Sequence, residues 1–217
     1  MKNTFISILF CLIASYSLAQ DNVGLNFAQN FTSFRFIDSQ GNFDENMSSD
    51  IRFSYGVNYN KIFNKGIFIR PEIGYKNFGA TSVMNENYKM SWNLHYADIN
   101  AGAGYIFNKF ALKPYIGASF YFSYLFKAEQ MMGQYYYNIW SSGEIKKTDF
   151  GINAFAGVVF AFSKTASVFL EFRNTTGLQQ LELNSYEGQN QKLFNRAFSL
   201  QFGLQFGIPQ NEKRFGV

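Results

Sequence analysis

Apolar and polar residues alternate over the last long segment of the chain, Phe194–Ile208. From Phe198 onward every second residue is Phe, Leu or Ile, and Ser, Gln or Gly stands between them. Successive side chains of a β-strand point to opposite faces. The segment is therefore predicted to be a strand with one large apolar face and one small, polar face.

The same alternation recurs along the chain and predicts eight strands. They are expected at Val23–Ile37, Ile51–Phe63, Ile67–Phe78, Trp92–Phe107, Phe110–Phe126, Lys147–Phe162, Ala166–Leu178 and Phe194–Ile208. No helical segment is available to cover eight apolar faces, so we predict that these faces meet lipid. A soluble barrel of the lipocalin type would show the inverse pattern, with its large side chains inside.

Short and long connections alternate between the predicted strands. Tight turns are expected at 64–66, 108–109 and 163–165, and long polar loops at 38–50, 79–91, 127–146 and 179–193. This rhythm indicates an up-and-down meander. Because an open sheet edge has no partner in lipid, the first and last strands must pair. The predicted fold is all-β: an eight-stranded antiparallel up-and-down transmembrane β-barrel with short periplasmic turns and long extracellular loops.

Two strands carry local irregularities. In the first strand the apolar positions change parity at Phe34 and Phe36, which predicts a β-bulge near Thr32 or Ser33. In the third strand Pro71 has no backbone donor, so a bulge or a local break in the ladder is expected there.

The N-terminus has the pattern of a cleavable signal peptide. Lys2 is basic, an apolar run covers Phe5–Ala14, and the small residues at 17–19 resemble an A-x-A cleavage site. We place the cut between Ala19 and Gln20. The alternative is an N-terminal anchor helix.

Cleavage would leave a barrel domain at 20–217 after a signal peptide at 1–19, exported to the outer membrane of a Gram-negative cell envelope. Cys11 is the only cysteine and lies in the leader, which excludes disulfides and thiolate chemistry from the mature chain. Beyond the leader no apolar run approaches the roughly 20 residues of a membrane-spanning helix. One residue in five is aromatic, which fits strands that face lipid on one side.

The net charge of +4 becomes +3 once Lys2 is removed. The basic residues are scattered, whereas nucleic-acid binding needs a concentrated basic patch, so no nucleic-acid partner is expected. The expected lipid partners are outer-membrane lipids and lipopolysaccharide, whose phosphates such a chain attracts only weakly.

Nine charged residues fall on the inward parity of the predicted strands. They are Arg52, Arg70, Glu72, Lys76, Asp98, Lys113, Asp149, Glu171 and Arg173. An eight-stranded barrel has an interior just wide enough for side chains, and unpaired charges there would each cost several kcal/mol. We predict ion-paired and water-bridged networks that plug the barrel. The alternative is an ion path.

His95, the only histidine, lies near the loop end of the fourth strand, with Asp98 and Glu86 close in sequence. Some outer-membrane hydrolases use His, Ser and a carboxylate, but the chain has no G-x-S-x-G motif. A single His without Cys does not support a metal site either. We therefore expect His95 to be a rim residue, and we predict no enzyme activity and no catalytic, cofactor-binding or metal-binding residues.

Aromatic residues fall into two groups. The first lies at strand ends and is expected to form the girdles at the two membrane interfaces, although a stacking platform for sugar or nucleic acid is an alternative: Tyr55, Tyr59, Phe63, Trp92, Tyr105, Phe107, Phe126 and Phe162. The second comprises Tyr135, Tyr136, Tyr137 and Trp140 in the loop Lys127–Lys146. Exposed loop aromatics favour partner binding, although this cluster could also be a strand extension packed within the loop.

Three segments resemble the PorT-like family of small outer-membrane barrels of Bacteroidetes. They are Lys113-Pro114-Tyr115-Ile116-Gly117, Thr148-Asp149-Phe150-Gly151 with Ala156-Gly157, and Phe172-Arg173-Asn174-Thr175-Thr176-Gly177-Leu178. The resemblance implies an eight-stranded outer-membrane barrel without agreed catalytic residues. It also implies a link to protein secretion for some relatives. Unlike many barrels, this chain continues past its last strand, from Pro209 to Val217, so Phe206 or Phe215 would have to serve as the terminal aromatic insertion signal.

From these patterns we predict a structural, adhesive or surface-interaction role through the outer loops. One alternative is an accessory component of a protein-secretion or envelope-assembly complex, bound through the loop Lys127–Lys146. A more distant alternative is an enzyme that modifies outer-membrane lipids.

Overall fold

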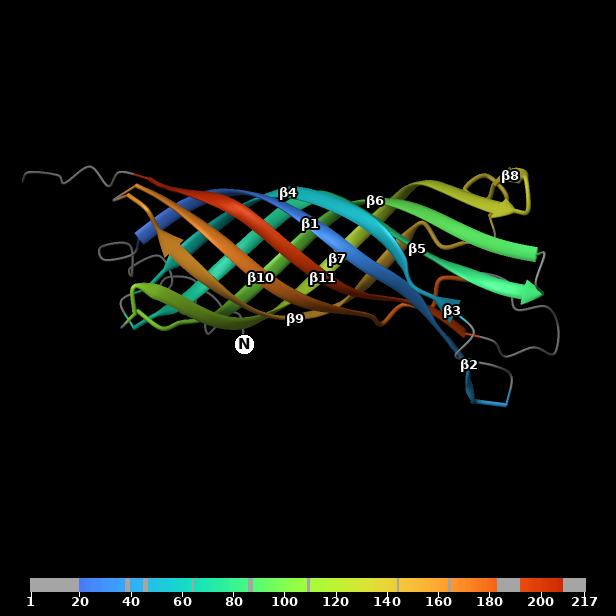
Figure 1. Ribbon diagram of the computed structural model, residues 1–217, viewed down its shortest axis with the longest axis horizontal. Coiled ribbons are helices and arrows are strands. Elements are labelled where there is room, and N and C mark those ends of the chain that lie inside the picture. Colours follow the sequence, from blue (N-terminus) through green and yellow to red (C-terminus); the bar gives the residue numbers. More distant parts are fainter. Residues whose placement is uncertain are drawn as a thin grey trace, which may run out of the picture.

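Eight long β-strands lie side by side around a cylinder in the computed structural model (Figure 1). The structure describes residues 20–37, 40–44, 47–63, 65–85, 88–108, 110–143, 145–163, 165–182 and 192–208. The long strands are β1 (Gln20–Ile37), β4 (Asp50–Ile62), β5 (Ile67–Asn85), β6 (Tyr88–Ile106), β7 (Leu112–Met132), β9 (Thr148–Ala161), β10 (Ala166–Gly177) and β11 (Lys192–Gly207). Three short strands, β2 (Phe43–Asp44), β3 (Met47–Ser48) and β8 (Tyr135–Asn138), pair with the long ones. Within these ranges no helix is long and apolar enough to cross a membrane.

The ring is closed by antiparallel pairing of β1 with β11. Their register runs without interruption from Asn22 opposite Gly207 to Ile37 opposite Lys192. Every other long strand pairs with its neighbour in the chain, and β9 follows β7 because β8 folds back on β7 alone. The predicted up-and-down barrel with paired first and last strands is confirmed.

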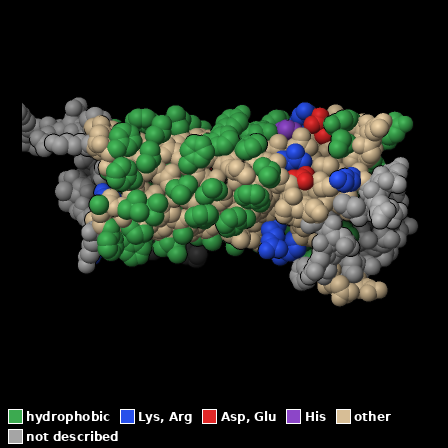
Figure 2. Space-filling model, viewed as in Figure 1, with side chains coloured by type: hydrophobic (Ala, Val, Ile, Leu, Met, Phe, Trp, Pro, Cys, Tyr) green, Lys and Arg blue, Asp and Glu red, His purple; other side chains and the backbone are tan. Residues whose placement is uncertain are grey.

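Burial alternates along the strands as the sequence predicts. On β11, Phe198, Phe202 and Phe206 are exposed, whereas Ser199 and Gln201 are buried. The outward apolar side chains of all eight long strands are here called the apolar belt. Figure 2 shows the part of this belt that lies on one face of the barrel. Large apolar side chains therefore cover the outside of the barrel and not its interior.

The two ends of the cylinder differ. At one end, called the short-turn end, tight turns join β4 to β5, β6 to β7 and β9 to β10. At the same end β1 begins and β11 ends. Gly66 in the first turn has φ 85°, and a Cβ built on it would lie 2.5 Å from the carbonyl oxygen of Ile106. Only glycine fits this close approach without strain.

At the other end, called the hairpin end, strands continue where long loops were predicted. The predicted loop 79–91 is mostly strand, because β5 extends to Asn85 and β6 starts at Tyr88. The predicted loop 127–146 contains the last part of β7 and all of β8. These loop predictions are wrong. Their polar residues stand on strands that project beyond the apolar belt, where the outer face meets water and does not need to be apolar.

The predicted β-bulge near Thr32 or Ser33 is also wrong. The β1–β11 register is continuous through both positions, and Phe34 points inward on the regular parity with only 4% of its surface exposed. The apolar positions change parity because the barrel interior itself becomes apolar at the hairpin end. A bulge does occur on β7, where His95 pairs with Lys127 and Tyr96 pairs with Leu125, leaving Phe126 unpaired.

The local break predicted at Pro71 is present. In the β4–β5 ladder Asn58 pairs with Glu72, and pairing resumes only at Lys61 with Ile69. The register is the same on both sides of the gap, so the missing donor of Pro71 interrupts the ladder without a bulge.

Two apolar layers close the interior of the barrel. The layer at the short-turn end consists of Phe68, Ile106, Tyr115 and Phe155. The layer at the hairpin end is larger and comprises Phe34, Phe78, Ala80, Leu94, Tyr96, Leu125, Ala128, Ile139, Ile145, Leu181, Leu193 and Ala197. Trp92, predicted to lie in an interface girdle, packs against this second layer because it shares the inward parity of Leu94. The polar interior is thus enclosed between two apolar layers.

A charge placed on the apolar belt should oppose membrane insertion. Phe202 is 55% exposed near the middle of β11, and an arginine at the bilayer midplane of a barrel costs about 2–4 kcal/mol. We expect Phe202→Arg to lower the free energy of unfolding in lipid vesicles by that amount, measured by urea-dependent refolding. Tyr136→Arg, on the exposed strand β8, is the matched control and should change it by less than about 0.5 kcal/mol. Equal effects of the two substitutions would contradict the placement of the belt.

Candidate functional site

Glu171 is the centre of a buried ion-pair cluster in the middle of the barrel. Its side chain is fully buried, with one carboxylate oxygen 2.6 Å from Arg70 and the other 2.9 Å from Arg173. The hydroxyl of Tyr115 donates a further hydrogen bond to it at 2.9 Å. Two cations and one phenol thus compensate a carboxylate that burial would otherwise strongly destabilise.

Arg173 links Glu171 to a second acid across the barrel. Its two terminal nitrogens bind the two carboxylate oxygens of Glu72 at 3.0 and 3.2 Å, which is the bidentate geometry that an arginine fork favours. Arg70 is held differently: its guanidinium lies 4.2 Å from the ring centroid of Phe155. The cluster therefore ties β5 to β10 through the interior and rests on the apolar layer at the short-turn end.

A second polar group lies nearer the hairpin end. Lys76 forms an ion pair with Asp98 at 2.7 Å and stands 3.8 Å from the ring centroid of Tyr121. Tyr121 donates a hydrogen bond to Asp149 at 3.0 Å, and Asn195 donates another to the same carboxylate at 2.8 Å. These contacts join β5, β6, β7, β9 and β11 across the lumen.

Most of the inward charges predicted from the sequence meet in these two groups. Arg70, Glu72, Lys76, Asp98, Asp149, Glu171 and Arg173 are all buried. The other two are half-buried on either side: Arg52 pairs with Asp50 at 2.8 Å at the hairpin end, and Lys113 lies at the short-turn end. The predicted ion-paired network is confirmed, and sequence reasoning missed the aromatic residues Phe68 and Phe155 that support it. Their inward position in the strand alternation was the signal that could have identified them.

The interior lined by the described residues leaves little room for solvent. A cavity of about 30 Å³ is lined by Asn30, Glu72, Lys76, Asp98 and Arg173, among others. A second cavity, of about 20 Å³, lies beside Arg70 and Tyr115. Each has space for about one water molecule. This geometry favours a plug over a conduction path.

His95 faces outward, just beyond the apolar belt. Its Nδ1 lies 2.6 Å from the hydroxyl of Tyr75, and its Nε2 lies 3.8 Å from a carboxylate oxygen of Glu129, which pairs with Lys127 at 2.9 Å. Asp98, its neighbour in sequence, points into the barrel, and Glu86 lies outside the described residues. The hydrogen-bond partner of His95 is thus a tyrosine and not a serine, and the group has no nucleophile–base arrangement of the hydrolase type.

Among the described residues, no three His, Cys, Asp or Glu side chains are arranged to hold a metal ion. Sequence reasoning missed Tyr75 and Glu129 as neighbours of His95. Tyr75 stands on the adjacent strand at outward parity, but its approach depends on the β5–β6 register. Glu129 approaches because the bulge at Phe126 shifts β7 by one residue.

Among the described residues, the three consecutive tyrosines are the most exposed aromatic group beyond the belt. Tyr135 and Tyr136 are 71% and 74% exposed on β8. Trp140, predicted to belong with them, packs instead against the apolar layer at the hairpin end and donates a hydrogen bond to the carbonyl of Leu125 at 3.1 Å. The alternative prediction for this cluster was a strand extension packed within the loop. It holds for the backbone of β8 and for Trp140, while the tyrosines remain exposed.

Five other members of the predicted girdle group lie on the outer wall, where an interface position remains a prediction. Tyr55, Tyr105, Phe107, Phe126 and Phe162 are exposed on the outward face. A groove of about 870 Å³ crosses the apolar belt over β4–β7, where the small side chain of Ala97 lies between Tyr75, Ile99 and Tyr124. Its apolar lining suits the acyl chains of surrounding lipid.

A closed antiparallel barrel with an apolar exterior and a filled interior defines a small transmembrane β-barrel protein. The sequence comparison agrees: residues 18–182 match the family described as outer membrane protein beta-barrel domain. This match covers more than half of the chain, so the protein belongs to that family and is an outer-membrane protein. No curated protein matches the sequence.

Solved structures show the same fold at low sequence identity. Neisserial surface protein A is 18% identical, with a TM-score of 0.52 over 88% of this chain and 99% of its own. The outer membrane protein AlkL is 13% identical, with a TM-score of 0.50 over 90% and 93% of the two chains. The outer membrane protease OmpT of Escherichia coli reaches a TM-score of 0.38 at 12% identity over 88% and 97%, which is too low to carry an inference about activity. In barrels of this class the short turns face the periplasm, so the hairpin end is the extracellular end.

Removing the central carboxylate should destabilise the barrel. Glu171→Gln leaves Arg70 without an acid, and breaking a buried ion pair costs about 3–5 kcal/mol. We expect the free energy of unfolding in vesicles to fall by about 3 kcal/mol. The same exchange in the exposed pair, Glu129→Gln, should cost less than about 1 kcal/mol. If Glu171→Gln were as mild as Glu129→Gln, the cluster would not be a structural plug.

His95 should titrate below its ordinary range. Burial lowers the pKa of His95, and the charge of Lys127 lowers it further, while Glu129 opposes them. Because the pKa of His95 is lower in the folded protein than in the unfolded chain, protonation favours the unfolded chain. Neutral His95 therefore contributes to stability above the unfolded pKa, and this contribution is lost as the pH falls from the unfolded pKa to the folded pKa. NMR titration should show a depressed pKa that rises in Lys127→Gln. A pKa at or above the ordinary value in the unsubstituted protein would contradict this placement.

Proposed function

We propose that this protein is a side-chain-filled outer-membrane barrel that acts through its hairpin end, by binding another protein at the cell surface. The observation that carries the proposal is the position of β8: an exposed, tyrosine-rich strand that pairs only with β7 among the described strands and lies beyond the apolar belt (Figure 1). The filled interior supports an interaction role over transport.

Within the described part of the chain, the backbone of β8 offers an open sheet edge. Ile139 donates its N–H to the carbonyl of Ala128 on β7 at 3.1 Å. Hydrogen-bonded pairs alternate along an antiparallel ladder, so Tyr137 and Tyr135 also face β7. Tyr136 and Asn138 then direct their backbone groups away from it. An unpaired edge of this kind accepts an extended segment of another chain by β-strand addition.

The side chains of β8 fit such a contact. Tyrosine supplies a large, amphipathic surface at low cost in side-chain entropy. The three exposed tyrosines place apolar surface on both faces of β8, and exposed apolar surface of this kind marks interaction sites. Backbone pairing at the edge and tyrosine packing on both faces would act together on one peptide segment.

A role as an accessory component of a secretion or envelope-assembly complex is the second candidate. It is supported by the same edge, which accommodates a polypeptide in extended form, and by the resemblance of the three sequence motifs to PorT-like barrels. A lipid-modifying enzyme has less support, because the polar group at His95 pairs with Tyr75 and with no serine.

The edge can be tested with two substitutions at one position. Tyr136→Pro removes a donor that faces away from β7, whereas Tyr136→Ala removes the side chain and keeps the donor. We expect photo-crosslinking from position 138 in intact cells to capture one protein partner. Tyr136→Pro should abolish this capture, and Tyr136→Ala should weaken it.

A crosslinker at Phe162, on the short-turn end, is the control and should not capture the same protein. An envelope-complex subunit as partner would favour the accessory role, and a protein from another cell would favour adhesion. Unchanged capture in Tyr136→Pro, with heat-modifiable gel mobility intact, would contradict the proposed edge contact.

A further inference from the structure

The seam between β1 and β11 carries two arginines on the outer wall of the barrel. Arg35 pairs with Phe194 across the seam, and Arg196 pairs with Ser33 two positions nearer the belt. Both side chains are on the outward parity of their strands. Lys192 is also exposed on β11, two residues beyond Phe194. Arg35, Lys192 and Arg196 are here called the seam patch.

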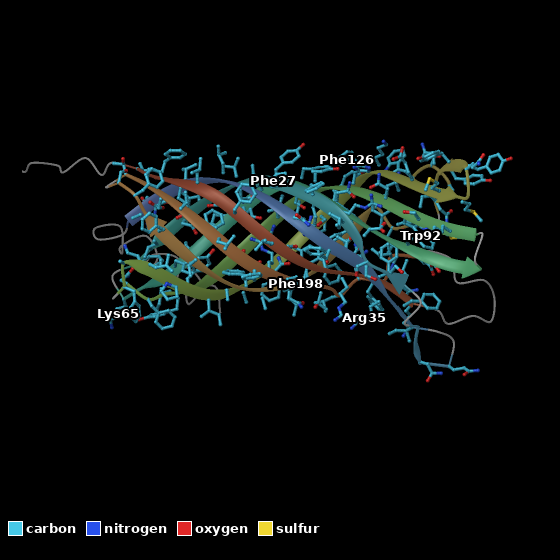
Figure 3. All side chains as sticks on the ribbon, viewed as in Figure 1. Phe27, Arg35, Lys65, Trp92, Phe126 and Phe198 are labelled. Carbon is cyan, nitrogen blue, oxygen red and sulfur yellow. The ribbon has the colours of Figure 1, made fainter. Side chains whose placement is uncertain are left out.

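The seam patch lies at the edge of the apolar belt. From Ile208 to Phe198 a strand covers roughly 24 Å of membrane depth, at ~3.4 Å per residue and a ~45° tilt. This matches the apolar band of about 25 Å that such barrels present. Arg196 then stands only ~5 Å above the belt, at the depth of lipid headgroups. Figure 3 shows Phe198 and Arg35 on the same side of the barrel, with Arg35 farther toward the hairpin end, and Figure 2 shows Lys and Arg atoms gathered directly beyond the belt.

The two guanidinium groups have no acidic partner among the residues that the structure describes. Arg35 is held in place by its own neighbour, because its guanidinium lies 4.5 Å from the ring centroid of Phe194. Its Nε is buried and has no hydrogen-bond partner. A buried, unbonded donor on a fixed side chain is costly, which indicates that an acceptor belongs there.

The opposite wall of the barrel provides a contrast at a similar height. There Lys127 pairs with Glu129 at 2.9 Å, next to the half-buried His95. That wall is close to neutral, whereas the seam patch forms no ion pair with the side chains that the structure describes. The difference points to an anionic ligand at the seam alone.

We propose that the seam patch binds the phosphate group of a phosphorylated glycolipid in the outer leaflet. Two arginines present planar donor forks that match phosphate oxygens in bidentate geometry. The exposed Phe198 and Phe31 lie directly below on the same two strands and would contact the acyl chains of the same molecule. A soluble polyanion has no apolar part that could contact these two phenylalanines. The combination of arginines with exposed phenylalanines therefore commits the site to a lipid.

Such a ligand would also act on the fold. The β1–β11 pairing closes the barrel, and it joins the two ends of the chain. A phosphate that bridges Arg35 on β1 and Arg196 on β11 would fasten this seam at its membrane edge. Binding would thus stabilise the closed barrel in a membrane that contains the lipid.

The test compares lipid binding by the folded protein in a zwitterionic detergent, using diphosphoryl lipid A as the probe and native mass spectrometry as the readout. Arg35→Gln/Arg196→Gln should lower the affinity roughly 10- to 100-fold, because each guanidinium supplies charge-assisted hydrogen bonds. Arg35→Lys/Arg196→Lys should fall between, since it keeps the charge and loses the fork. Heat-modifiable gel mobility confirms that each variant is folded.

Lys65→Gln/Lys89→Gln removes two exposed charges elsewhere and is the matched control, which should bind like the unsubstituted protein. Equal loss in this control would show that net charge alone attracts the lipid and would overturn the proposal. Unchanged binding in Arg35→Gln/Arg196→Gln, or equal binding of chemically dephosphorylated lipid A, would overturn it as well. Displacement of the lipid by inositol hexakisphosphate at equal concentration would reassign the patch to soluble polyanions.

Discussion

Lipid offers no hydrogen-bond partner to a backbone, and this constraint determines the rest of the structure. The sheet must close on itself, and the uninterrupted pairing of β1 with β11 achieves this. Closure in turn assigns the two faces of every strand, because alternate side chains point to lipid or to the lumen. The apolar belt and the polar interior therefore both follow from closure of the sheet into a ring. The alternation along the long strands reports this closure and does not indicate an activity.

The narrow lumen makes the protein a filled cylinder. Glu171 binds both Arg70 and Arg173 in the middle, and an apolar layer covers this cluster at each end. Such an interior holds strands from opposite sides of the ring together and has little room for a substrate. Chemistry that depends on partners is consequently expected outside the cylinder, on the strands that project beyond the belt and on the wall at the membrane edge.

The barrel could be predicted from the sequence because its signal is a simple parity. Phe202 and Gln201 reveal the two faces of β11 without any knowledge of neighbouring strands, and Glu171 and Arg173 reveal the lumen in the same way. The errors arose where alternate positions no longer separate an apolar outer face from a polar inner face. Beyond the belt the outer faces of the strands meet water, and both faces of β8 are exposed, so these strands looked like loops. An apolar interior at Phe34 looked like a bulge. The contact of His95 with Tyr75 and Glu129 depends on register and on the bulge at Phe126, which local sequence does not encode.

The central claim is that β11 faces lipid on one side and a filled interior on the other. Nitroxide scanning along β11 in bilayers, with dissolved oxygen and a water-soluble nickel complex as relaxing agents, tests it directly. Labels at Phe198, Phe202 and Phe206 should collide with oxygen, whereas labels at Ser199 and Gln205 should be shielded from both agents. Access of the nickel complex to Ser199 and Gln205 would reveal a water-filled lumen, and oxygen access without a period of two would contradict the barrel wall itself.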